Sequence, residues 1–115
     1  MNEHLRRFKR IVAQVSDQSG VNFRHHGLQD LILDVGKDPS PAQIAASAAI
    51  YFCREVNQYN GSEPGLLVVM DFICETSTSF PPECTEDASR DLIALLNRGA
   101  GFDDVLQWVL QWYKA

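Results

Sequence analysis

The chain has 115 residues, of which 45% are hydrophobic and 22% are charged, and its formal net charge is −5 at pH 7. This composition is typical of a globular rather than a disordered chain, and the length predicts one domain over residues 1–115. No stretch approaches the roughly 18 apolar residues of a membrane-spanning helix, and no apolar signal segment follows the basic N-terminus. The three cysteines match no disulfide or zinc-ligand spacing, so we expect a cytoplasmic protein with reduced thiols.

Residues 2–19 form the first predicted helix, because five apolar residues recur at spacings of three and four and therefore share one face. The residues of this apolar stripe are Leu5, Phe8, Ile11, Val12 and Val15. Arg6, Lys9 and Arg10 fall on the opposite side. Such a basic amphipathic helix could lie on a membrane or on DNA. We favour the simpler interpretation, in which the basic side is the solvated face of a helix that packs on the core.

A short helix is predicted over residues 28–36, and the next start signal is stronger. Ser40 can cap a helix, Pro41 suits the first helical position, and Gln43 can complete a capping box. The helix that follows, over about residues 41–58, is rich in small residues in its first half, which lets a neighbouring backbone approach closely. Apolar residues cover most of its circumference, so we expect it to be buried.

The most apolar stretch of the chain is Gly65–Glu75, with the sequence GLLVVMDFICE and two charges, Asp71 and Glu75. The pattern fits a helix, with the two carboxylates one turn apart on a narrow polar strip, and it also fits a strand. Val-Val and Phe-Ile favour a strand, but no second strand-like run is present to pair with it. We therefore predict a buried central helix over about residues 64–76, beginning near Pro64, with a strand as the alternative.

Two more helices are predicted after an irregular segment. The first covers about residues 85–97, with Thr85 as a typical N-cap. The second begins at Phe102, carries apolar residues at helical spacing as far as Tyr113, and has Trp108 and Trp112 along its edge. The predicted fold class is therefore all-α, a single compact domain of five or six helices around the buried central helix.

No motif in the chain assigns a catalytic or cofactor-binding residue. The adjacent histidines at residues 25–26 and the dispersed cysteines lack the paired spacing of zinc ligands. Asp71 and Glu75 could act as general acid and base or hold a divalent ion. An exposed edge of the central helix, or an ion pair with an arginine such as Arg54 or Arg90, explains them more simply. No catalytic, cofactor-binding or metal-binding residue is therefore predicted.

Charge is distributed unevenly along the chain. Residues 1–10 carry four basic side chains and one acidic side chain, a local net charge of +3, whereas the remaining residues carry six basic and fourteen acidic ones, a net charge of −8. An acidic body repels nucleic acid and favours a partner with a basic surface. Aromatic side chains such as Trp108 and Trp112 are common at the centres of protein interfaces.

We therefore predict a small acidic interaction protein without enzyme activity, most concretely an inhibitor of the immunity or antitoxin type. Its partner would be a protein with a basic surface, such as a toxin or nuclease, and carboxylates would steer their association. The predicted partner-binding residues are Glu83, Glu86, Asp87, Asp91, Asp103, Asp104, Trp108 and Trp112.

Two other functions stay open at this point. One is a small metal-dependent enzyme that uses the carboxylates of Asp71 and Glu75. The other is a nucleic-acid-binding regulator that uses the basic N-terminal helix. A homodimer also stays open, whereas membrane binding and direct binding of nucleic acid by the acidic body are not expected.

Overall fold

The computed structural model describes residues 3–19, 39–56, 64–77, 85–111 and 113. Within these residues the chain forms helices and no strand, which confirms the all-α prediction for the part of the chain described. The helices are α1 (Glu3–Ser19), α3 (Pro41–Val56), α4 (Pro64–Thr76), α5 (Thr85–Asn97) and α6 (Phe102–Leu110). The short helix predicted over residues 28–36 lies outside the described residues.

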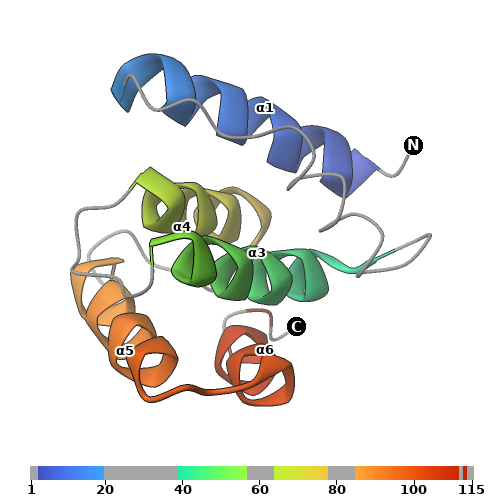
Figure 1. The fold of residues 1–115 in the computed structure, drawn as a ribbon. Helices are drawn as coiled ribbons and strands as arrows, with labels where there is room; N and C mark the ends of the chain where they lie inside the picture. Colours follow the sequence, from blue (N-terminus) through green and yellow to red (C-terminus); the bar gives the residue numbers. More distant parts are fainter. Residues whose placement is uncertain (1–2, 20–38, 57–63, 78–84, 112, 114–115) are drawn as a thin grey trace.

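The helices are arranged in three layers (Figure 1), with α1 on one side, α3 and α4 in the middle, and α5 and α6 on the other side. Helix α1 packs mainly on α4, and α6 packs mainly on α3. The radius of gyration of 12.8 Å agrees with the value of about 13 Å expected for a compact chain of this length. The middle layer is therefore covered by helices on both sides.

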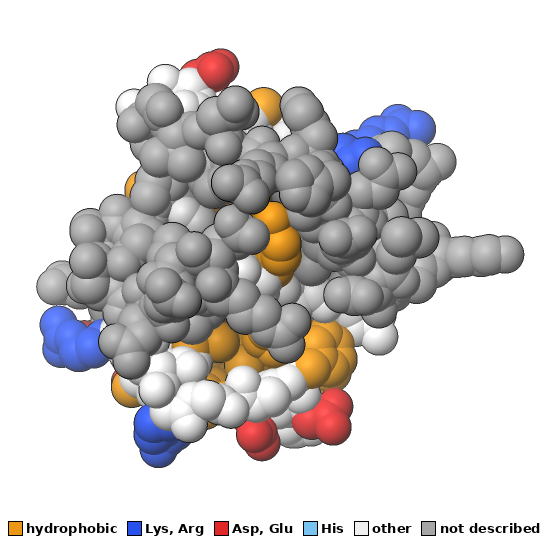
Figure 2. Space-filling model, in the orientation of Figure 1, with side chains coloured by type: hydrophobic (Ala, Val, Ile, Leu, Met, Phe, Trp, Pro, Cys, Tyr) orange, Lys and Arg blue, Asp and Glu red, His pale blue; other side chains and the backbone are white. Residues whose placement is uncertain are grey.

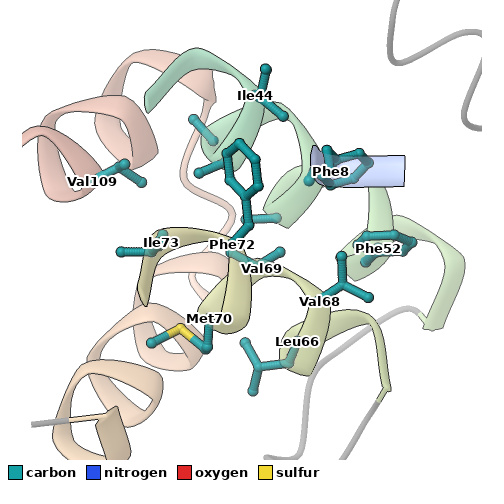
Figure 3. Packing of buried hydrophobic residues seen from close by; sticks show 14 of the residues in the cluster. Phe8, Ile44, Phe52, Leu66, Val68, Val69, Met70, Phe72, Ile73 and Val109 are labelled. Atoms are coloured by element: carbon teal, nitrogen blue, oxygen red, sulfur yellow. The ribbon is translucent and has the colours of Figure 1, made fainter. Parts of the chain in front are cut away.

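The central apolar stretch is a helix, as predicted, and it begins at Pro64. Val68, Val69, Phe72 and Ile73 are completely buried on it. The Phe72 ring makes an edge-to-face contact with Phe8 of α1, with ring centroids 5.7 Å apart (Figure 3). A helix satisfies its own backbone hydrogen bonds, so this element needs no partner strand. The strand alternative is therefore excluded.

The apolar stripe predicted for the first helix is confirmed as the buried face of α1. Its five residues are each at most 5% exposed, and they are Leu5, Phe8, Ile11, Val12 and Val15. The spacing of the stripe thus determined which side of α1 faces the core.

The predicted capping box is present at the start of α3. The Ser40 backbone N–H donates to Oε1 of Gln43 at 2.9 Å, and the Gln43 N–H donates to Oγ of Ser40 at 3.2 Å. These two bonds satisfy backbone donors that the first turn of a helix leaves without partners. Pro41 occupies the first helical position, where its lack of an N–H costs nothing.

Helices α3 and α4 approach each other closely where α4 begins. Gly65, the second residue of α4, lies against Phe52 of α3, and a Cβ atom at Gly65 would be 2.7 Å from both Cβ and Cγ of Phe52. Small residues fill the α3 side of the core, and they are Ala42, Ala45, Ala46, Ala48 and Ala49. The close approach predicted for the alanine-rich helix is therefore present, and it also requires a glycine on α4.

A Schellman motif ends α5 and leads the chain into α6. The Gly99 N–H donates to the Leu96 carbonyl at 3.0 Å, and the Ala100 N–H donates to the Leu95 carbonyl at 3.3 Å. Gly99 has a φ of +84°, a left-handed conformation that glycine adopts without strain.

Helix α6 is shorter than the apolar periodicity predicts. It ends at Leu110, and the Tyr113 N–H donates to the Leu110 carbonyl at 3.1 Å in a tight turn. Tyr113 instead reaches α4, where its hydroxyl is hydrogen-bonded to Thr76. The extension of the helix to Tyr113 is therefore wrong, because this side chain is held by a contact outside α6.

We expect Gly65→Ala to lower the free energy of unfolding by about 1–3 kcal/mol, because an added Cβ would overpack the contact with Phe52. The gain in helix propensity, at most about 1 kcal/mol, does not offset this cost. Urea denaturation measures the change. Gly101→Ser is the control, since no atom lies within 4 Å of a Cβ at Gly101, and its stability should stay within about 0.5 kcal/mol of the wild type. A Gly65→Ala variant as stable as the wild type would contradict the close approach.

Candidate functional site

The described carboxylates of the predicted partner-binding set all lie on the α5–α6 layer. Asp87 and Asp91 are exposed on α5, and Asp103 and Asp104 are exposed in the first turn of α6. The side chains of Glu83, Glu86 and Trp112, also predicted to bind the partner, lie outside the described residues. The structure therefore places four of the six predicted carboxylates in the same layer of the molecule.

The carboxylates of α6 and of α5 interact with different local charges. Asp103 and Asp104 follow Gly101, which provides no side-chain cap, so their charges complement the positive end of the α6 dipole. On α5, the Arg90 guanidinium lies 3.8 Å from Oδ1 of Asp87, and both side chains are highly exposed. An exposed pair of this kind contributes at most about 1 kcal/mol. Arg90 and Arg98 are both exposed in this layer, so it carries positive as well as negative charge.

Trp108 is partly buried and packs against the hydrophobic core. Its indole ring therefore helps to pack α6 on the core, and only part of the ring is accessible to a binding partner.

Two other apolar residues of α6 are more exposed than the sequence suggests. Phe102 is 38% exposed and Leu110 is 42% exposed, whereas Val105 and Val109 are completely buried. Leu106, four residues from each of the exposed pair, is partly buried. The sequence pattern predicted helical spacing for all five residues and did not separate buried from exposed positions. The sequence could have indicated this exposure, because the apolar arc of α6 is broader than one neighbouring layer can cover.

Phe102, Leu106 and Leu110 are spaced four residues apart and therefore form one continuous flank of α6. Asp103 lies beside this flank, three residues before Leu106, whereas Asp104 lies on the opposite side of the helix. We call the flank together with the carboxylate of Asp103 the α6 face. Figure 2 shows acidic and hydrophobic side chains at the lower edge of the molecule, where Figure 1 places α6. The α6 face thus combines exposed apolar surface with negative charge.

Asp71 and Glu75, the other carboxylate pair considered from the sequence, lie on the exposed edge of α4. Nη2 of Arg10 donates to Oε1 of Glu75 at 2.7 Å. The pairing with an arginine is therefore present, but the arginine comes from α1 and is neither Arg54 nor Arg90. Partial burial raises the pKa of the Asp71 carboxyl, and the neighbouring Glu75 raises it further.

The exposed edge of α4 offers no set of metal ligands within the described residues. Leu67, which is 51% exposed, and Cys74 lie on it with the two carboxylates. No three His, Cys, Asp or Glu side chains of the described ranges come together as a metal site would require. The histidines at residues 25–26 and Cys84 lie outside these ranges.

The end of α4 is tied to the segment after α6 by a chain of hydrogen bonds. The Thr76 hydroxyl donates to the Phe72 carbonyl at 2.7 Å. Because that hydroxyl has a single proton, the Tyr113 hydroxyl donates to Oγ1 of Thr76. This contact holds the C-terminal end of α6 against the middle layer. Burial raises the pKa of Tyr113 to about 12, because the phenolate would be poorly solvated there.

Comparison with known proteins does not identify this arrangement: no protein-family model, no curated protein and no solved structure matches the chain. In the part of the chain that the structure describes, no helix combines the length and the apolar character needed to cross a membrane.

We expect Tyr113→Phe to destabilise the protein by about 1 kcal/mol at neutral pH, because the hydrogen bond to Thr76 is lost. The variant should also change the response to alkali. The folded pKa of about 12 exceeds the ordinary value of 10.0, so the unfolded chain releases this proton first and stability falls as the pH rises from 10 towards 12. Below pH 10 this contribution is fully present.

Denaturation curves of wild type and variant across this pH range test the assignment, because the difference between them isolates Tyr113. The matched control is Tyr51→Phe on α3, which removes a different phenol and should keep the alkaline loss. Equal alkaline losses in the wild type and in Tyr113→Phe would show that Tyr113 ionises as freely in the fold as in the unfolded chain.

Proposed function

We propose that this protein is a cytoplasmic interaction protein, an inhibitor of the immunity or antitoxin type that binds and masks a basic surface of a toxin or nuclease. The observation that carries the proposal is the spatial separation of charge in the fold. Four exposed carboxylates of α5 and α6 lie in one outer layer with two exposed arginines, Arg90 and Arg98, and the basic residues of α1 lie in the other outer layer.

This separation matters because the basic N-terminus could otherwise neutralise the acidic surface. The middle layer of α3 and α4 stands between the two outer layers. The positive charge of Arg10 is balanced by Glu75 of α4, so it does not neutralise the carboxylates of the α5–α6 layer. An acidic surface left open in this way attracts a basic partner and can raise the association rate by roughly 10–10³-fold at low ionic strength.

The structure favours neither of the other two functions considered from the sequence. Glu75 is already paired with Arg10, which explains one of the two carboxylates proposed for metal-dependent catalysis. On α1, the acidic residues Glu3 and Asp17 accompany the basic ones, and the acidic α5–α6 layer adds repulsion for a polyanion. We therefore retain the protein-binding function.

The test begins with capture of partners on the tagged full-length protein, followed by their identification by mass spectrometry. The association rate of the captured basic partner is then measured with the variant Asp91→Asn/Asp103→Asn/Asp104→Asn. We expect the rate to fall at least about tenfold at low salt, and the difference from the wild type to shrink at high salt. Thermal unfolding checks that the variant is folded, since α6 loses dipole-stabilising charges.

Glu3→Gln/Asp17→Asn on α1 is the control, because it removes negative charge from the opposite layer and should leave the association rate unchanged. A captured partner that binds the three-site variant as fast as the wild type would rule out the acidic-face mechanism. Failure to recover any stoichiometric basic partner would count against the proposed function itself.

A further inference from the structure

We draw no further inference here: the strongest candidate, the exposed apolar flank of α6 formed by Phe102, Leu106 and Leu110, carries no proposal because nothing in the structure shows what covers it.

Discussion

The burial of α4 between α1 and α3 is the constraint on which the rest of the structure depends. Val68, Val69, Phe72 and Ile73 are inaccessible to solvent, and burial of each such side chain stabilises the fold by about 1.5–3 kcal/mol. The helix can be enclosed this fully because α3 approaches it closely at Gly65. Only a narrow strip of α4 with two carboxylates remains at the surface. The main role of α4 is therefore structural.

The position of the α6 face follows from this central packing. Helix α3 contacts α4 on one side and α6 on the other, and the hydrogen bond from Tyr113 to Thr76 ties the segment after α6 back to α4. A helix of this length packed on one neighbouring layer buries a narrow face, which Val105 and Val109 occupy. The flanking apolar residues Phe102 and Leu110 are consequently left at the surface.

The same layered arrangement converts an uneven charge distribution along the chain into two separated surfaces. Sequence position predicted a basic beginning and an acidic remainder, and the carboxylates of α5 and α6 were identified from it. Their grouping on one layer and the pairing of Arg10 with Glu75 depend on neighbours that only the fold brings together, whereas Asp87 and Arg90 are three residues apart on α5. The exposure of Phe102 and Leu110 also depends on the fold, since periodicity placed them on one helix without deciding whether they are buried.

The sequence by itself determined the elements whose signals are local. The capping box at Ser40 and Gln43 set the start of α3, the stripe from Leu5 to Val15 set the buried side of α1, and the apolar run after Pro64 predicted the central helix. Only the tertiary structure decided where α6 ends, which of its apolar residues are buried and which arginine meets Glu75. The physical reason is range: caps and spacing act within a few residues, whereas burial and ion pairing depend on side chains that lie far apart in the chain.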